Sequence, residues 1–324
     1  MAILVTGAAG FVGFHTTNAL LDRGEQVIGV DNLNAYYAPS LKQARLDALT
    51  AREGFDFVRL DIAEHHELVG AVADRGVDRI VHLAAQAGVR YSLENPFAYA
   101  KANLVGHLSI LELARTIKPK HLVYASSSSV YGGNTKIPFA ETDMTDDPAS
   151  LYGATKKADE LMSQSYARLY GLPVTGLRFF TVYGPWGRPD MAYWIFTKAI
   201  LEGRPIRLFN QGQMGRDFTY IDDCVAGVIA ALDQPPADRS PSHRVYNLGN
   251  NHPEELLKLV QVLEGALGRE AEKTLEPMQP GDVERTWADP SRAEDELGFS
   301  ASTSLEEGLA KFVAWYQEHG PFDE

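Results

Sequence analysis

Three glycines in the first turn of the chain constrain its fold more than any other feature. They stand at positions 7, 10 and 13, after the apolar run Ala2–Thr6 and before an amphipathic segment that extends to Leu21. Such a short apolar run is typical of a buried parallel strand. Glycine permits the tight turn into a helix and lets a pyrophosphate approach the backbone at the helix N-terminus. The spacing therefore predicts a βαβ unit that binds a dinucleotide.

An acid closes this unit where a nucleotide ribose is expected. The second apolar run, 27–30, stops at Asp31, eighteen residues after Gly13. A carboxylate at this place can accept hydrogen bonds from the adenine ribose hydroxyls. Its charge would repel a 2′-phosphate, and the next residue, Asn32, is not basic. The sequence therefore favours NAD over NADP.

Strand-like and helix-like segments alternate regularly up to residue 180. The further predicted strands cover 55–60, 79–83, 121–125 and 174–179, and the helical patterns between them cover 39–51, 64–73, 96–117 and 150–170. This alternation predicts an α/β fold with a doubly wound parallel sheet of the Rossmann type.

The regular alternation of strands and helices ends at about residue 180. Beyond it the sequence is richer in glycine and proline and predicts short, mixed elements. Helices are expected at 192–202, 222–233, 254–267 and 305–319, with a surface loop at 234–241. We therefore expect two parts, 1–180 and 181–324, with the second a smaller mixed lobe and with chain crossings between them.

Composition and charge exclude several classes of function. The 324 residues carry a formal net charge of −13, which disfavours nucleic acid or an anionic membrane as the main partner. Cys224 is the only cysteine, so an internal disulfide is excluded, and no metal-ligand constellation appears. No apolar run approaches the roughly 20 residues that span a bilayer, and no signal peptide is recognised. A cytoplasmic location is expected.

Two segments carry candidate chemistry at the end of the predicted fifth strand and in the helix after it. Tyr152 and Lys156 are four residues apart and so share one face of a helix. The charge of the lysine favours phenolate, which would lower the pKa of Tyr152 and suit it to proton transfer. Four successive serines, 126–129, follow the strand, and Ser127 precedes Tyr152 by twenty-five positions.

With these motifs the chain resembles the extended short-chain dehydrogenases/reductases of the nucleotide-sugar epimerase type. The matching segments span nearly the whole chain in the expected order. They are Thr6–Gly13, Asp31–Asn34, Asp61-Ile62, His82–Ala85, Asn103, Ser126–Gly132, Tyr152–Lys156, Arg178–Phe180, Tyr183–Pro185, Arg216–Tyr220 and Pro280–Asp282.

The resemblance implies a role for each catalytic candidate. Tyr152 would be the general base at the sugar C4 hydroxyl, Ser127 would share its hydrogen bond, and Lys156 would lower its pKa and hold the nicotinamide ribose. Tightly bound NAD would take the C4 hydride and return it to the other face of a transient 4-keto sugar. Residues 1–180 would form the NAD-binding domain, and 181–324 the nucleotide-sugar-binding lobe.

The resemblance also implies a set of cofactor contacts along the first part of the chain. The expected NAD-binding residues are Gly7, Gly10, Phe11, Val12, Gly13, Asp31, Asn32, Asn34, Asp61, Ile62, Leu83, Ala84, Ala85, Asn103, Tyr152, Lys156 and Phe179.

The residues after Ser127 bear on the type of reaction. Dehydratases of this family carry an Asp-Glu pair there, and decarboxylating relatives carry a glutamate just before the Val-Tyr-Gly. This chain has Ser128 and Ser129, which cannot serve as comparable acids or bases at neutral pH. Elimination and decarboxylation therefore lose support, and 4-epimerisation gains it.

The sugar is indicated by blocks that resemble the UDP-glucuronate 4-epimerases: 31–37, 86–92 and 180–191. A C6 carboxylate needs hydroxyl or cationic donors, and Ser128, Ser129, Thr181 and Arg188 are candidates. Arg216 matches a diphosphate contact and Asp282 a uridine contact, although Gln279 stands where some relatives have arginine. The expected substrate-binding residues are Arg90, Ser127, Ser128, Ser129, Tyr152, Thr181, Arg188, Arg216 and Asp282.

Other readings remain open. Arg90 has a rival interpretation as an ordinary surface arginine. The alternative functions are a UDP-glucose 4-epimerase, a UDP-glucuronate decarboxylase and a non-catalytic protein that binds NAD and a UDP-sugar.

The resemblance also implies a homodimer, because in this family the helices predicted at 96–117 and 150–170 pair with those of a second copy into a four-helix bundle. Its candidate contacts are the leftover apolar residues Leu104, Leu108, Leu111, Leu161, Met162 and Leu169.

Overall fold

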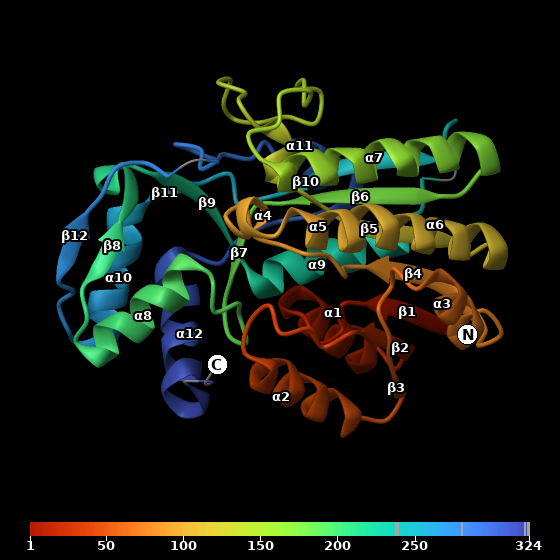
Figure 1. Ribbon diagram of the computed structural model, residues 1–324, viewed down its shortest axis with the longest axis horizontal. Helices are drawn as coiled ribbons and strands as arrows, with labels where there is room; N and C mark the ends of the chain where they lie inside the picture. The colour runs from red at the N-terminus through yellow and green to blue at the C-terminus, as the bar shows by residue number, and fades with distance from the viewer. Residues whose placement is uncertain (237–239, 280, 321, 323–324) are drawn as a thin grey trace.

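A seven-stranded parallel sheet, ordered β10-β6-β5-β4-β1-β2-β3, forms the centre of the molecule (Figure 1). The computed structural model describes residues 1–236, 240–279, 281–320 and 322. The strands are β1 Ala2–Thr6, β2 Gln26–Asp31, β3 Phe55–Arg59, β4 Val77–His82, β5 His121–Ser127, β6 Val174–Phe179 and β10 His243–Leu248. The doubly wound parallel sheet predicted from the sequence is therefore confirmed.

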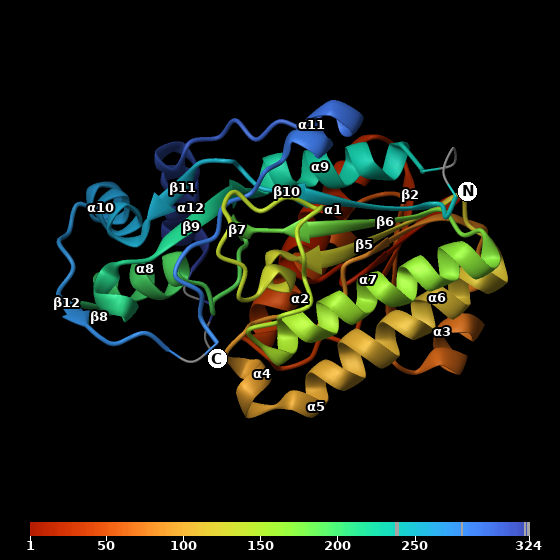
Figure 2. The same cartoon turned by 90° about the horizontal axis from the view of Figure 1, so that it is seen from above.

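Helices cover both faces of the sheet, as a buried parallel sheet requires. One face carries α1 (Phe11–Asp22), α9 (Ile221–Asp233) and α11 (Ser291–Leu297), and α2 (Pro39–Thr50) packs beside α1. The other carries α3 (His65–Val72), α6 (Gly106–Ile117) and α7 (Leu151–Tyr170). Figure 2 shows α9 and α11 on one side of the strands and α3, α6 and α7 on the other. The central strand β1 is buried along its whole length, whereas the edge strand β3 is only partly buried.

The helix predicted at 96–117 is present, and it widens in its middle. Two short helices, α4 (Tyr91–Glu94) and α5 (Pro96–Tyr99), lead into a π-helical stretch, η1 (Ala100–Val105), which continues as α6. The buried Asn103 lies in this stretch and hydrogen-bonds to Gln86 and Thr155 on neighbouring segments. Apolar periodicity does not reveal such a widening, because the apolar pattern of an α-helix and of a helix with one π-helical turn is nearly the same.

The second part of the chain builds small sheets beside the large one. One has the order β11-β9-β7 and the other pairs β12 with β8. Their strands are β7 Thr181–Tyr183, β8 Ile206–Leu208, β9 Gly215–Tyr220, β11 Pro253–Glu255 and β12 Lys273–Leu275. The helices α8 (Ala192–Glu202), α10 (Leu256–Leu267) and α12 (Leu305–His319) pack around an aromatic core. The four helices predicted after residue 180 are present. The edge strand β10 and the short helix α11 were not predicted from the sequence.

Some predicted features fall partly on residues that the structure does not describe. Residues 237–239 of the expected surface loop and Pro280 of the Pro280–Asp282 motif lie outside the described residues. Within the described residues, no helix is long and apolar enough to cross a membrane.

Candidate active site

The glycine-rich turn leaves no room for larger side chains. Gly7 has a φ of +73°, and a Cβ atom there would lie 2.7 Å from the backbone nitrogen of Ala84. A Cβ atom at Gly13 would lie 1.9 Å from the carbonyl oxygen of Gly7. Gly10 is the N-cap of α1 and brings no capping side chain, so the first turn keeps backbone N–H groups open to a ligand. This bare helix N-terminus fits the pyrophosphate of NAD.

A cavity follows the carboxyl edge of the large sheet, and all but one of the residues predicted to bind NAD line it. The lining residues among them are Gly7, Gly10, Phe11, Val12, Gly13, Asp31, Asn32, Asn34, Asp61, Ile62, Leu83, Ala84, Ala85, Tyr152, Lys156 and Phe179. The cavity therefore runs from the glycine turn past the ends of β2, β3, β4 and β6, where ligands of this sheet type bind. We call it the cofactor cavity.

Asn103 is the exception, because it is not among the residues that line the cofactor cavity. Its amide accepts a hydrogen bond from the backbone nitrogen of Gln86 at 2.8 Å and donates to the Gln86 carbonyl at 3.1 Å and to Thr155 Oγ1 at 3.0 Å. Gln86 itself lines the cavity. Asn103 thus fixes the loop after β4 against α7, and its direct contact to a cofactor stays a prediction.

A buried lysine that sequence reasoning missed stands at the ribose end of the cofactor cavity. Lys42 Nζ lies 2.8 Å from both the backbone oxygen and the side-chain oxygen of Asn34. Burial lowers the pKa of Lys42 to about 8, against the opposing charge of Asp31. Asp31 accepts hydrogen bonds from the backbone nitrogens of Ala9 and Leu33. A lysine in a helical pattern usually predicts a solvated face, so only the fold reveals its place.

The three catalytic candidates come together from β5 and α7. Ser127 ends β5, and its Oγ accepts a hydrogen bond from the backbone nitrogen of Ser129 at 3.1 Å. Tyr152 lies in the first turn of α7, which Ser150 caps by accepting from the Gly153 nitrogen. A Cβ atom at Gly153 would lie 2.4 Å from the carbonyl oxygen of Ser129. Because of this close approach, the start of α7 packs directly against residues 126–129, which we call the serine segment.

Lys156 is held from two sides. Its Nζ donates to the carbonyl oxygen of Ala125 at 2.9 Å and to Asp159 Oδ2 at 3.1 Å. The lysine is 3% exposed and nevertheless lines the cofactor cavity. An ammonium group has three N–H donors, so these two contacts leave one for a ligand in the cavity.

A second cavity adjoins the first and contains most of the predicted substrate contacts. It is lined by Ser127, Ser128, Ser129, Tyr152, Thr181, Arg188, Arg216 and Asp282. Ser127, Tyr152 and Arg188 line both cavities. The second cavity, which we call the substrate cavity, therefore opens onto the cofactor cavity at the hydroxyls proposed for proton transfer.

Arg188 is part of a polar link between the two parts of the chain. Its Nε lies 3.0 Å from Asp190 Oδ1, and Asp190 also accepts a hydrogen bond from the Tyr36 hydroxyl at 3.0 Å. Although burial opposes the charge, Asp190 raises the pKa of Arg188. Arg188 thus stays a cation at the junction of the two cavities. Tyr36 and Asp190 were not predicted from the sequence.

The other predicted cations differ in their surroundings. Burial lowers the pKa of Arg216, with Asp282 opposing, and its Nη1 donates to the carbonyl oxygens of Gly215 and Glu284. Arg90 does not line the substrate cavity and instead pairs with Asp282 at 3.0 Å and packs on the ring of Phe209. Arg90 therefore reaches the substrate cavity only through Asp282.

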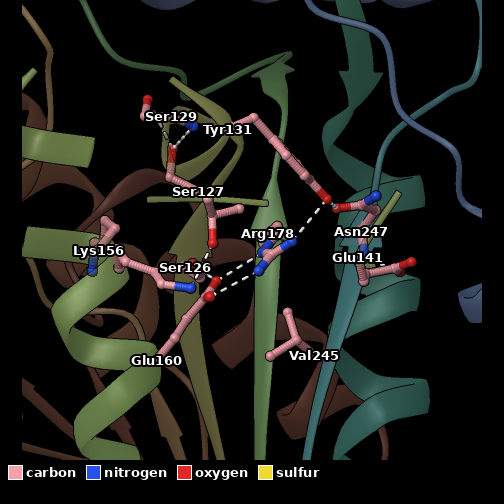
Figure 3. A network of polar contacts seen from close by, with 12 residues as sticks. Ser126, Ser127, Ser129, Tyr131, Glu141, Lys156, Glu160, Arg178, Val245 and Asn247 are labelled. Carbon is pink, nitrogen blue, oxygen red and sulfur yellow. Dashed lines mark hydrogen bonds and ion pairs between the residues drawn. The ribbon is translucent and has the colours of Figure 1, made fainter. Parts of the chain in front are cut away.

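A buried network supports the serine segment from behind. Glu160 accepts hydrogen bonds from Ser126 Oγ at 2.7 Å and from two nitrogens of Arg178 at 2.8 Å. Arg178 also donates to the Tyr131 hydroxyl, which donates to Asn247. Figure 3 shows this chain crossing from α7 to β10 beside Lys156. Through Glu160, this network fixes Ser126, the neighbour of Ser127, to α7.

The residues described by the structure contain no group of three or more His, Cys, Asp or Glu side chains that could hold a metal ion.

This chain is similar in sequence and in structure to several proteins named as UDP-glucuronate 4-epimerases. A probable UDP-glucuronate 4-epimerase of Rhizobium meliloti is 49% identical over 98% of this chain and 98% of the relative. UDP-glucuronate 4-epimerase 4 of Arabidopsis thaliana is 51% identical over 98% of this chain and 75% of the relative. The crystal structure of UDP-glucuronic acid 4-epimerase from Bacillus cereus, in complex with UDP-glucuronic acid and NAD, has a TM-score of 0.90 and 35% identity over 98% of this chain and 99% of its own.

The family assignment rests on most of the chain. Residues 3–249 match the NAD dependent epimerase/dehydratase family. This stretch includes the glycine turn, the serine segment and the Tyr152–Lys156 helix described above. The chain belongs to the NAD dependent epimerase/dehydratase family.

Proposed function

We propose that this protein is an NAD-dependent UDP-glucuronate 4-epimerase, which interconverts UDP-glucuronate and UDP-galacturonate. The observation that carries the proposal is the shared wall of the two cavities. Ser127 and Tyr152 line both, so a proton-accepting hydroxyl stands between a cleft that fits NAD and a pocket with cationic donors. Residues 1–180 supply the cofactor side, and 181–324 supply Thr181, Arg188, Arg216 and Asp282 to the substrate side.

In the proposed reaction Tyr152 accepts the proton of the C4 hydroxyl and later returns it. Ser127 shares the hydrogen bond of that oxygen, and Lys156 stabilises the phenolate through its charge. Bound NAD supplies a reversible hydride acceptor, so no external oxidant is consumed. Returning the hydride requires the 4-keto sugar to present its other face within the substrate cavity.

The polar groups of the substrate cavity support a sugar acid as substrate. Ser128, Ser129 and Thr181 offer hydroxyl donors and Arg188 a cation, a combination suited to a C6 carboxylate. Arg216 lies at the same wall and suits the diphosphate. A held carboxylate also keeps the 4-keto acid from the geometry that favours loss of CO₂, and no acid follows Ser127 to assist that loss.

A product assay tests the proposal. Purified protein is incubated with UDP-glucuronate, UDP-galacturonate and UDP-glucose in turn, without added oxidant. We expect each sugar acid to give its 4-epimer, and UDP-glucose to react more slowly. A UDP-pentose with CO₂ would identify a decarboxylase, and faster turnover of UDP-glucose would identify a neutral-sugar epimerase. No turnover with retained NAD would support the non-catalytic alternative.

A homodimer through α6 and α7 is part of the proposal. Leu108, Leu161 and Leu169 are 42%, 55% and 66% exposed on these neighbouring helices, which supports a bundle with a second copy. Leu111 was wrongly expected among them, because it is fully buried against the sheet of its own chain. Replacing Leu108 and Leu161 together by lysine should give a monomer in light scattering; an unchanged dimer mass would exclude this surface. The cytoplasmic location stays a prediction.

A further inference from the structure

The buried face of α7 is polar along most of its length, which is unusual for a helix packed on a sheet. Its buried side chains include Thr155, Lys156, Asp159, Glu160 and Ser163. Most of them have polar partners on other elements. Thr155 contacts Asn103, Lys156 contacts the Ala125 carbonyl, Glu160 pairs with Arg178, and Ser163 contacts His107.

Asp159 stands out because, among the described residues, its side chain hydrogen-bonds only to Lys156, on its own helix. Its Oδ2 lies 3.1 Å from Lys156 Nζ, and the side chains are 1% and 3% exposed. Its Oδ1 has no hydrogen-bond partner within the described part of the chain. Burial raises the pKa of Asp159 to about 6, with the charge of Lys156 opposing. A buried carboxylate with so few hydrogen-bond donors is costly to keep charged.

The other charged groups around this pair are already compensated or neutral. Glu160 is paired with Arg178, and Asp190 with Arg188. His82 on β4 and His107 on α6 face the lysine, but burial lowers the pKa of His82 to about 3 and that of His107 well below its usual value. Tyr152 itself is faced by the Tyr99 ring from α5 at 6.0 Å and by the charge of Arg188.

We propose that Asp159 is a positioning residue that sets how much positive charge Lys156 presents to Tyr152, and thereby the pH range in which Tyr152 can accept a proton. The inference rests on the proposed function, since it assigns Tyr152 the role of base. An anion against the ammonium of Lys156 reduces its field at the phenol. The same anion is the counter-charge of the buried ammonium, whose Nζ lies 3.1 Å from Asp159 Oδ2.

Removing the charge at Asp159 should therefore shift both limbs of the pH profile in the same direction. Without the anion, Tyr152 forms phenolate at lower pH, and the buried Lys156 also loses its proton at lower pH. The two helix turns between Tyr152 and Asp159 separate their backbones by about 10 Å. A unit charge at that distance and an effective dielectric constant of about 20 shifts a titration by about one pH unit.

The first test is the pH profile of kcat/KM for UDP-glucuronate. Asp159→Asn keeps the size and an acceptor oxygen but removes the charge. We expect the acid limb of its profile, set by Tyr152, about one pH unit below that of the wild type, and the alkaline limb, set by Lys156, lower by at least as much. Asp159→Ser removes the same charge with a smaller side chain and should shift the same way. Asp159→Glu keeps the charge and should restore the wild-type limbs.

The chain offers a control carboxylate, Asp146, beside the next lysine of α7. Lys157 lies 3.8 Å from Asp146, whose side chain is 73% exposed. Asp146→Asn removes one carboxylate from the neighbouring lysine and should leave the profile unchanged. A shift in this control equal to that of Asp159→Asn would overturn the inference, because net charge alone would explain both.

The second test needs no turnover. The ultraviolet absorbance of phenolate is titrated in each NAD-loaded protein and in its Tyr152→Phe counterpart, and the difference reports Tyr152. In Asp159→Asn the Tyr152 signal should appear about one pH unit lower than in the wild type. Superimposable titrations would overturn the inference, and so would an equal shift in Asp159→Glu. An inactive wild type would refute the proposed function alone, because this titration still decides the role of Asp159.

Discussion

Tyr152 carries the proton transfer in this account, and its hydroxyl can be removed without changing the shape of the site. We expect Tyr152→Phe to lower kcat by about 10²- to 10⁴-fold, the usual contribution of a positioned acid-base group. Bound NAD should remain, because the glycine turn and Asp31 are untouched. Tyr166→Phe is the matched control, since Tyr166 lies on the same helix but its hydroxyl donates to Glu112. Unchanged turnover in Tyr152→Phe would remove this residue from its role.

Arg188 is the residue whose replacement should separate acidic from neutral sugars. A hydrogen bond to a charged group is worth about 1.5–3 kcal/mol. We therefore expect Arg188→Ala to lower kcat/KM for UDP-glucuronate roughly 10- to 100-fold more than for UDP-glucose. Arg207→Ala serves as control, because Arg207 pairs with Glu276 outside both cavities. Equal losses for both sugars would count against a carboxylate-facing role.

Sequence patterns identified residues whose chemistry is local and missed those whose role depends on packing. Gly7 and Gly13 follow a strand and open a helix, so their spacing already implies the turn. Asp159, Lys42 and Asp190 have ordinary helical or loop contexts, and nothing in the sequence signals that the fold buries or pairs them. Long-range pairing of charges is set by tertiary structure, which composition and periodicity do not encode.

The start of α7 is an element whose position depends on one glycine. Alanine favours helix over glycine by about 1 kcal/mol, so Gly153→Ala should strengthen an isolated helix. In the protein its Cβ would lie 2.4 Å from the Ser129 carbonyl oxygen and force the helix away from the serine segment. We expect kcat to fall about 10- to 100-fold, since small displacements of reacting groups are costly.

A glycine in an open helical position provides the comparison for that change. Gly265 lies in α10 with nothing within 4 Å of an added Cβ. Gly265→Ala should raise the free energy of unfolding by roughly 0.5–1 kcal/mol and leave kcat unchanged. If Gly153→Ala behaved the same way, the close contact between α7 and the serine segment would have no catalytic role.

Elements with strong periodicity were predictable, and elements defined by their neighbours were not. Helices such as α7 and α12 have long amphipathic patterns with capping serines at Ser150 and Ser304. The edge strand β10 follows a loop in the second part of the chain, yet pairs with β6 along six residues. β10 belongs to the large sheet because the chain crosses back from the second part to pair with β6. Local strand propensity does not show such a long-range pairing.

At the scale of the whole molecule, buried histidines should make the fold sensitive to acid. Burial lowers the pKa of His82 to about 3 and that of His121 to about 4, whereas unfolded histidine titrates near 6.5. The unfolded chain therefore binds more protons as the pH falls below about 6.5. Stability is lost from about pH 6.5 down to about 4 through His121 and down to about 3 through His82. Each histidine contributes up to about 1.4 kcal/mol per pH unit over this range. Asp159, whose pKa is raised in the folded protein, acts in the opposite direction, because there the folded state takes up the proton first. This single group offsets the proton uptake of one histidine at most.

Urea unfolding with excess NAD checks this dependence. We expect a lower free energy of unfolding at pH 5.5 than at pH 7.5. In His121→Gln the difference should shrink by about 1.4 kcal/mol, because one buried titrating group is gone. His66→Gln, at an exposed position, should leave the difference unchanged. Equal stability of the wild type at both pH values would contradict the neutral, buried state of these rings.

The fate of the C4 hydrogen shows whether the hydride stays on the enzyme during turnover. UDP-glucuronate carrying deuterium at C4 is mixed with unlabelled UDP-galacturonate, and the products are analysed by mass spectrometry and NMR without added cofactor or oxidant. If the hydride is stored on the enzyme during each turnover, UDP-galacturonate should form with deuterium retained at C4 and without CO₂. Loss of the label to solvent, or formation of a UDP-pentose, would contradict the account.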